Sequence, residues 1–159
     1  NNFQEIFKIK SMIQRLQSIY LLLAGLSIGG QYSEWAYYLK SNKPDGGVFA
    51  DSTFNVWDNM VQVVLWGTSL VLCLAAIFLY KNRKLQTSIL KTALFVLTMP
   101  VVSAYLDVWE YIKNVQDGMV YSWGIVTPVL LFVTFVLILL ALMAIKKDEQ
   151  TVQSMDRLR

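Results

Sequence analysis

Four long apolar stretches, separated by short polar segments, make up most of this chain of 159 residues. About 20 consecutive apolar residues of helix are needed to cross the hydrocarbon core of a bilayer. Hydrophobic residues account for 55% of the chain and charged residues for 16%, against about 25% charged in a typical soluble domain. The pattern therefore predicts an all-α integral membrane protein, a bundle of four transmembrane helices.

The predicted bundle occupies residues 18–145. Its spans are expected at about 18–39, 59–80, 88–111 and 127–145. The last span is the most apolar: between residues 129 and 145, thirteen of seventeen are Leu, Ile, Phe or Val. At about −0.5 kcal/mol each on the insertion scale, these residues contribute roughly −6 kcal/mol. The first span is the weakest, because Gly29, Gly30 and Gln31 interrupt it.

Polar segments flank the predicted bundle. Residues 1–17 place apolar side chains at mostly helical spacing among Lys8, Lys10 and Arg15. This is typical of an amphipathic segment on the membrane surface; a disordered basic leader is the alternative. Residues 146–159 are expected to form a charged tail with a short cytoplasmic helix. No cleavable signal peptide is expected, because the first span leads into further spans without an A-x-A-like cleavage site.

The distribution of lysine and arginine predicts the orientation, because short cytoplasmic segments carry an excess of these residues. Only three of the 14 fall on one side of the spans: Lys40, Lys43 and Lys113. The others gather on the opposite side: Lys8, Lys10, Arg15, Lys81, Arg83, Lys84, Lys91, Lys146, Lys147, Arg157 and Arg159. Both termini are therefore expected in the cytoplasm, in agreement with an even number of spans.

Aromatic and small residues give two further patterns. One tryptophan falls at the outer end of each span, at the headgroup depth that indole rings favour: Trp35, Trp57, Trp109 and Trp123. Helices in lipid associate through small and polar residues, and each span carries one stripe of them. The stripes are Ser18, Gly25, Gly29 and Ser33; Asn59, Gln62, Trp66, Ser69, Cys73 and Ala76; Ser88, Thr92, Met99, Ser103 and Asp107; and Gly124, Thr127, Thr134, Ala141 and Ile145. They predict one compact bundle, with a polar pore as the alternative.

The residues needed for common catalytic and metal chemistry are missing. The chain contains no histidine and one cysteine, Cys73. The commonest general base is therefore absent, as are histidine ligands for zinc, copper or haem. One cysteine excludes an intrachain disulfide. We expect no catalytic residue, no metal site and no cofactor, and hence no enzymatic activity.

Carboxylates near the outer ends of the spans are the best candidate site. Asp107 and Glu110 are i, i+3 on the third span, and Glu34 and Asp58 are expected at the same depth. Carboxylates deep in a membrane are functional by default, but these lie at the interface, where water and Lys113 solvate them. The first expectation is a solvated rim. A cation or proton site, or a docking patch formed with the Trp and Tyr residues, is the alternative.

Two stretches, residues 12–24 and 144–159, resemble a family of small four-span inner-membrane proteins of Gram-negative bacteria described only as a domain of unknown function. The first reads MIQRLQSIYLLLA; the second contains AIKKDE and SMDRLR. The family usually starts at the methionine corresponding to Met12, so residues 1–11 depart from it. The resemblance implies no activity, cofactor or catalytic residue.

The resemblance also suggests a cytoplasmic contact. Gln14-Arg15 and Asp156-Arg157 lie in the two matching stretches. We hypothesise that they form one paired surface on the cytoplasmic side, which an Arg15→Ala/Asp156→Ala double-mutant cycle would test.

The leading functional hypothesis is a non-enzymatic accessory or assembly subunit of a larger complex in the bacterial inner membrane. It rests on the missing catalytic residues, the short loops and the two polar termini on one face. The expected partners are membrane lipid and other inner-membrane proteins, not nucleic acid. The candidate partner or ion contacts are Arg15, Asp107, Glu110, Asp156 and Arg157. The alternative is a small-solute or ion translocator acting as a homo-oligomer, motivated by the polar stripes, the carboxylates and a kink expected at Pro100.

Overall fold

The computed structural model describes the backbone of residues 2–42, 49–114 and 121–156, with side chains for 16–42, 49–113, 121–152 and 154. The elements in this part of the chain are α1 Asn2–Gly30, β1 Tyr37–Ser41, β2 Thr53–Asn55, the 3₁₀ helix η2 Val56–Asp58, α2 Met60–Phe78, α3 Arg83–Asn114, β3 Tyr121–Trp123 and α4 Val126–Asp156. The expected four helices are confirmed. The expectation of an all-α chain is corrected, because three strands form a small sheet.

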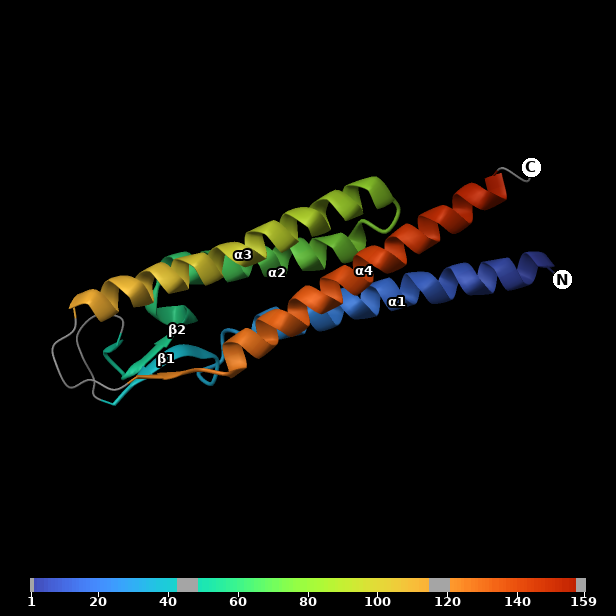
Figure 1. Cartoon of the computed structure of the whole chain (residues 1–159). Helices are drawn as coiled ribbons and strands as arrows, with labels where there is room; N and C mark the ends of the chain where they lie inside the picture. Colours follow the sequence, from blue (N-terminus) through green and yellow to red (C-terminus); the bar gives the residue numbers. More distant parts are fainter. Residues whose placement is uncertain (1, 43–48, 115–120, 157–159) are drawn as a thin grey trace.

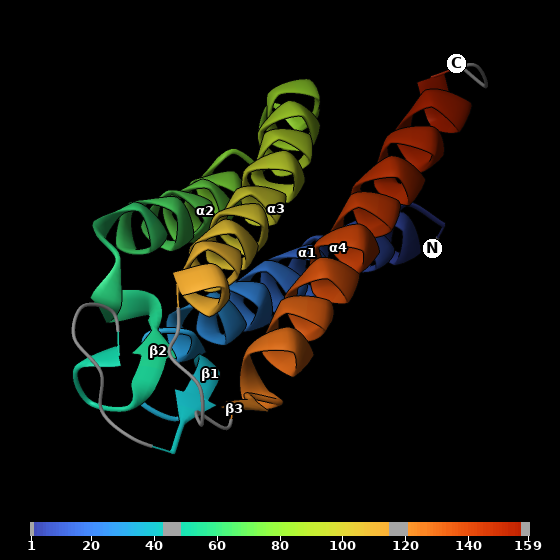
Figure 2. The ribbon, with the colours of Figure 1, turned by 60° about the vertical axis from the view of Figure 1, so that its left-hand side comes forward.

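The helices form two close pairs. α1 packs along α4 and α2 packs along α3, while α1 also contacts α2. α3 and α4 make fewer contacts with each other. Both chain ends lie at one end of the bundle and the sheet lies at the other, as Figures 1 and 2 show. We call these the terminal end and the sheet end.

Within the residues whose side chains the structure describes, three helices are long and apolar enough to cross a membrane: Met60–Phe78, Arg83–Lys113 of α3 and Val126–Val152 of α4. In α1, Asn2–Gly30, side chains are described from Leu16 on, and the stretch Leu16–Gly30 is apolar. Large apolar side chains are exposed on the outside of the bundle. A surface of this kind is typical of a membrane protein, whose surrounding solvent is lipid.

The first helix ends at Gly30 and does not continue to residue 39 as predicted. Glycine costs about 1 kcal/mol relative to alanine inside a helix, and Gly29 and Gly30 are consecutive. The chain then turns, with the Tyr32 N–H donating to the Gly29 carbonyl and the Ser33 N–H to the Gly30 carbonyl. The part of the predicted span that follows contains Tyr37 and Tyr38, and aromatic residues favour strands.

α3 and α4 are longer than the predicted spans 88–111 and 127–145, whereas α2, Met60–Phe78, is slightly shorter than the predicted 59–80. α3 begins at Arg83, so it takes in most of the basic 81–87 segment, and α4 runs on to Asp156 without a break. The predicted tail helix is thus a continuation of α4. At the terminal end, Arg83 Nη2 lies 2.7 Å from Asp148 Oδ2, and this ion pair joins the start of α3 to α4.

The predicted packing stripes are confirmed for α2 and α4 and wrong for α3. The predicted positions from Gln62 to Ala76 are the buried ones on α2, and those on the fourth span are buried as well. On α3, Ser88 and Thr92 are exposed. The buried α3 positions are Gln86, Leu90, Ala93, Leu97, Pro100, Ala104 and Val108. This stripe also follows steps of three and four, but most of its members are apolar.

Glycines allow close packing of α1, but not at the pair of positions predicted. A Cβ at Gly25 would lie 3.3 Å from Leu74 Cδ2, and one at Gly30 would lie 3.2 Å from Leu130 Cδ1. Gly29 has open space around it instead. The contact glycines of α1 therefore face two different helices, α2 and α4.

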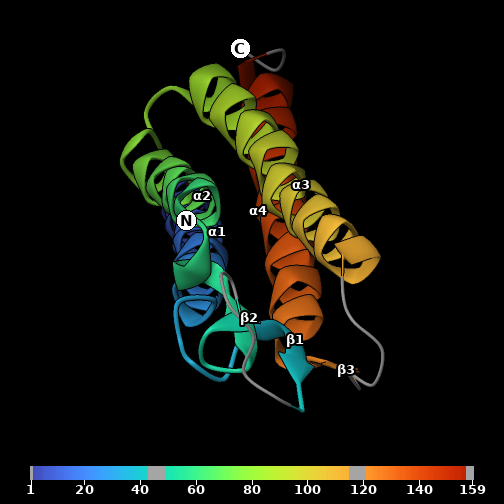
Figure 3. The ribbon, with the colours of Figure 1, turned by 90° about the vertical axis from the view of Figure 1, so that its left-hand side faces the viewer.

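The sheet has the order β2-β1-β3, and both pairings are antiparallel. In Figure 3 it lies across one end of the bundle. Beneath it lies a second apolar core, formed by Leu39, Phe49, Phe54, Ala104 and Val108. The sheet is therefore anchored on the last turns of α3 and is a folded cap, where the sequence indicated only short polar loops.

Glycine is required where the chain passes from β3 into α4. The Gly124 N–H donates to the Tyr38 carbonyl at 3.1 Å. A Cβ at this position would overlap the carbonyl oxygen of Tyr37. The close approach of these two backbones fixes the start of α4 against β1, and the Thr127 hydroxyl, which donates to the same Tyr37 carbonyl at 3.1 Å, reinforces it.

Candidate functional site

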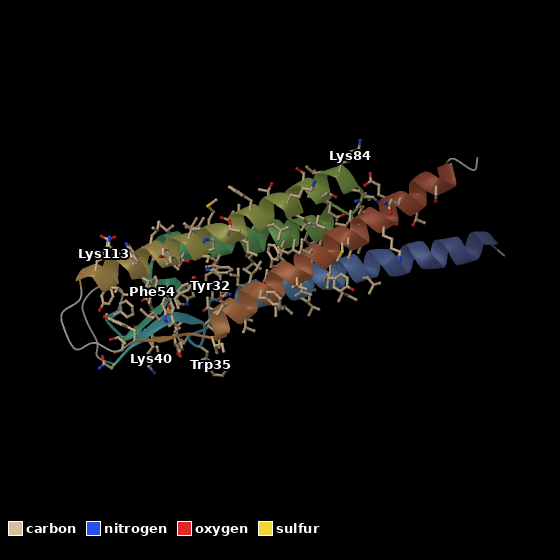
Figure 4. The ribbon with its side chains drawn as sticks, in the orientation of Figure 1. Tyr32, Trp35, Lys40, Phe54, Lys84 and Lys113 are labelled. Carbon is tan, nitrogen blue, oxygen red and sulfur yellow. The ribbon has the colours of Figure 1, made fainter. Side chains whose placement is uncertain are left out.

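The sheet end carries an open cavity of about 690 Å³ with mixed polar and aromatic walls. Its lining residues are Glu34, Trp35, Tyr37, Lys40, Asp51, Thr53, Asn55, Trp57, Asp58 and Val126. They come from the turn after α1, from β1, β2 and η2, and from the start of α4. Figure 4 shows Trp35 and Lys40 projecting from this end, on the side of the sheet away from Lys113. We call this cavity the cap site.

Hydrogen bonds hold the indole of Trp57 in place. Its Nε1–H donates to the Tyr32 carbonyl at 2.9 Å, and its ring meets the Tyr32 ring edge to face at a centroid distance of 5.4 Å. The Tyr32 hydroxyl in turn donates to the Val63 carbonyl at 2.7 Å. One wall of the cap site is therefore tied directly to α2.

Two carboxylates of the cap site shape the local backbone. Asp58 accepts the backbone N–H of Asn55 at 2.7 Å, and Asn55 accepts the backbone N–H of Trp57 at 2.8 Å. This reciprocal arrangement is a capping box. Asp51 accepts both the backbone N–H and the hydroxyl of Thr53. The rim of the cavity is thus fixed by its own side chains.

The cap site is acidic. It holds three carboxylates, Glu34, Asp51 and Asp58, and one lysine, Lys40. Burial raises the pKa of the Asp58 carboxyl above its usual range, the hydrogen bond from Asn55 opposes this, and the charge of Asp51 adds to it. A cation entering the site would relieve the repulsion between the carboxylates. Aromatic faces such as those of Trp35 and Trp57 also attract cations.

The structure separates the acidic residues that the sequence grouped together. Glu34 and Asp58 do line one cavity, as their common depth suggested, but Asp107 and Glu110 do not line it. Asp107 accepts the side-chain N–H of Asn59 at 2.7 Å, and Asn59 is the N-cap of α2. Asp107 therefore fastens α3 to the start of α2. Glu110 is exposed on α3.

The three remaining predicted contact residues are not tested. The side chains of Arg15 and Asp156 lie outside the described residues, and Arg157 lies outside them altogether. Their pairing stays a prediction. Within the described part of the chain, there is no group of three or more Cys, Asp or Glu residues placed to hold a metal ion.

Sequence reasoning missed a buried polar network next to the cap. The Tyr38 hydroxyl accepts the indole N–H of Trp66 at 2.7 Å and donates to Gln62 Oε1 at 2.9 Å. Gln62 Nε2 donates to the Pro100 carbonyl at 3.0 Å. The network links β1, α2 and α3. The sequence signalled only the amide of Gln62, which falls on a predicted packing stripe. Tyr38 gave no signal, because it fell inside the predicted first span.

The fold is a bundle of four helices with a folded cap on one end, and in the described part of the chain three of these helices are long and apolar enough to cross a membrane. A family model described as "Domain of unknown function (DUF4293)" matches residues 13–158. The chain belongs to this family, and the match includes nearly all of the two stretches that carried the resemblance. A search of curated proteins finds no match, and a search of solved structures finds none either.

Proposed function

We propose that this protein is a non-enzymatic accessory or assembly subunit of a larger complex in the bacterial inner membrane, with both termini in the cytoplasm. The charges at the two ends support the orientation. The exposed lysines of the terminal end include Lys84, Lys146 and Lys147, and Lys84 is labelled there in Figure 4. By the positive-inside rule this end faces the cytoplasm, and the cap faces the opposite side.

The observation that carries the proposal is the cap site. The sheet end has an apolar core of its own and presents two exposed aromatic rings: Trp35 is 80% exposed and Trp57 60% exposed. Tryptophan is among the residue types most enriched at the energetic centres of protein interfaces. With three carboxylates around these rings, the site suits a basic segment of a partner protein, through charge complementarity.

Packing along the bundle axis counts against the translocator alternative. The hydroxyls of Ser69 and Thr134 donate to the carbonyls one turn earlier on their own helices. The interior is filled by an apolar core of fully buried side chains that includes Leu21, Ile28 and Ile138. A path for ions within one copy would have to displace this core, so a translocator built from this chain would need its path between copies.

In vivo photo-crosslinking tests the proposal. A photoreactive phenylalanine analogue replaces Trp35 in the cap site or, as the control, Ile125, which is 75% exposed at the same end and does not line the cavity. We expect a discrete adduct with another membrane protein from position 35 only. Adducts with lipid alone, or the same adduct from both positions, would contradict a docking role for the cap site.

Charge reversal provides a second arm. Glu34 is exposed in the turn after α1, so Glu34→Lys should leave the fold intact. We expect it to weaken the position-35 adduct severalfold by removing a favourable rim charge, whereas Glu149→Lys at the terminal end should leave the adduct unchanged.

Impermeant thiol labelling of Lys84→Cys and Ser122→Cys tests the orientation: only position 122 should react from outside the intact inner membrane.

A further inference from the structure

A lateral groove runs between α3 and α4 in the half of the bundle nearest the cap. It consists of two adjoining hollows of about 200 and 360 Å³ that share Val101, Pro128 and Leu131. It extends from Trp123 and Val108 at the sheet end to Leu97 and Phe135 towards the middle of the bundle. α3 and α4 lie on either side of it (Figure 2).

Polar contacts to other helices keep the two walls apart. Gln62 of α2 donates to the carbonyl of Pro100 and holds α3 against α2. Gln31, just after α1, donates to the carbonyl of Thr127 at 3.1 Å and holds the start of α4 against the α1 side. Tyr38 and Trp66, which are joined by a hydrogen bond, also line the groove. The groove is therefore a consequence of the fold and does not depend on any flexible segment.

The lining offers almost nothing to a polar ligand. Both threonine hydroxyls of the lining are already engaged: the Thr127 hydroxyl donates to the Tyr37 carbonyl, and the Thr98 hydroxyl donates to the Phe95 carbonyl at 2.7 Å. The other walls are mostly aliphatic and aromatic. Apolar cavities of this kind are not stably filled by water, and the groove lies on helices long and apolar enough to cross a membrane.

The lining favours a hydrocarbon chain over a helix. Helix docking in lipid relies on small residues, and among the groove's α3 positions only Thr98 and Ala104 are small; the others are Leu97, Val101, Val102, Tyr105 and Val108. From Leu97 to Val108 the groove is about 17 Å long at 1.5 Å per residue.

The length and position point to one leaflet. The hydrocarbon core of a bilayer is about 30 Å thick, so one leaflet is about 15 Å deep, close to the length of the groove. The outer end lies at Trp123, which is 69% exposed and belongs to a residue type that prefers headgroup depth. We propose that the groove binds one acyl chain of a phospholipid from the leaflet on the cap side. This inference rests on insertion of the bundle in a membrane, but it does not depend on the role as an accessory subunit.

Photolabelling with a lipid tests the proposal. The purified full chain is reconstituted in vesicles of phosphatidylethanolamine and phosphatidylglycerol that contain a trace of phospholipid with a diazirine in its acyl chain. After illumination, peptide mapping locates the adducts. We expect the adducts to concentrate on the groove positions of α3 and α4 and to exceed those on the exposed face of α2 by about tenfold. The reason is that a bound acyl chain stays in the groove, whereas annular lipid exchanges rapidly.

Two matched variants sharpen the test. Val101→Trp fills the groove from the α3 wall, and Val71→Trp places the same ring on the exposed face of α2. We expect Val101→Trp to lower groove labelling about tenfold, as when an added side chain excludes an occupant, and Val71→Trp to leave it unchanged. Leu131→Trp, from the α4 wall, repeats the test if Val101→Trp fails to fold.

Three outcomes would overturn the proposal. Labelling spread evenly over all exposed helix faces would mean annular lipid only. Groove labelling unaffected by both filling variants would mean that the label lies elsewhere. Cross-links between Val101→Cys residues of two copies in the same vesicles, with no lipid adduct in the groove, would mean that a second chain covers it.

Discussion

Removing a single hydroxyl group should destabilise this protein by several kcal/mol. Tyr38→Phe keeps the ring and deletes the oxygen that accepts from Trp66 Nε1 and donates to Gln62 Oε1. Trp66 and Gln62 are both 0% exposed, so water cannot replace the lost partner. Each buried group left without a partner costs about 1–3 kcal/mol. With two such groups and some relaxation, we expect a loss of about 3 kcal/mol in the free energy of unfolding.

A double-mutant cycle tests the cause of that loss. Gln62→Met has a similar shape and no acceptor, so in the Tyr38→Phe/Gln62→Met variant one unsatisfied group disappears. The double variant should therefore be more stable than the sum of the single effects predicts, by about 1–2 kcal/mol. The free energies come from unfolding of micelle-bound protein with increasing sodium dodecyl sulfate, followed by far-ultraviolet circular dichroism.

The matched control is Tyr80→Phe, because Tyr80 is an exposed tyrosine at the end of α2. It should change the stability by less than about 0.5 kcal/mol. A Tyr38→Phe effect as small as that of the control, or strictly additive effects in the cycle, would refute the argument that the network is buried and coupled.

The Tyr38 hydroxyl also predicts a loss of stability at alkaline pH. Burial is the main cause that raises the pKa of Tyr38 to about 12 from an ordinary value of 10.0; the bond from Trp66 opposes it, and the charges of Asp107 and Tyr32 add to it. The folded state thus holds the proton more tightly than the unfolded state. This contribution to stability is complete below pH 10 and is lost as the pH rises through 12. Between these values wild type should lose more stability than Tyr38→Phe.

Two further predictions concern other parts of the fold. Gly124→Ala should lower the free energy of unfolding by at least about 1–3 kcal/mol, because its Cβ would overlap the Tyr37 carbonyl. Gly29→Ala, in open space on α1, should raise it by about 0.5–1 kcal/mol. Equal effects of the two variants in thermal unfolding would contradict the close approach of Gly124 to Tyr37. Arg83→Ala should lower the free energy of unfolding by about 3–5 kcal/mol, because Asp148 is 2% exposed and would lose its ion partner. The double variant Arg83→Ala/Asp148→Ala should recover part of that loss. A double variant no more stable than Arg83→Ala alone would show that the unpaired buried carboxylate is not the cause.

The helices were predictable because a helix satisfies its backbone hydrogen bonds locally. The runs that became α2 and α4 were found with the right buried faces, since Gln62, Ser69 and Thr134 mark them in an otherwise apolar context. The α3 face was mispredicted because small and polar residues were taken as its marker. Its buried positions are mainly apolar, and in lipid-facing helices apolar residues lie on both faces.

The candidate site was only partly predictable. Trp35, Trp57, Glu34 and Asp58 were all assigned to the outer ends of the spans, and they do line one cavity. Asp107 was grouped with them by depth alone. Its bond to Asn59 depends on how α3 rotates against α2, and the sequence contains no direct measure of that rotation.

By itself, the sequence determined the four apolar segments, the charged residues that flank them, and the end of the bundle at which Trp35, Trp57, Trp109 and Trp123 lie. It could do so because partition between water and lipid depends on each segment's own composition. Only the tertiary structure decided that the chain after Gly30 forms a sheet, that Tyr38 joins Gln62 and Trp66, and that α3 and α4 leave a groove between them. Strand pairing and helix rotation join residues far apart in the chain, so they depend on contacts that no local stretch of sequence contains.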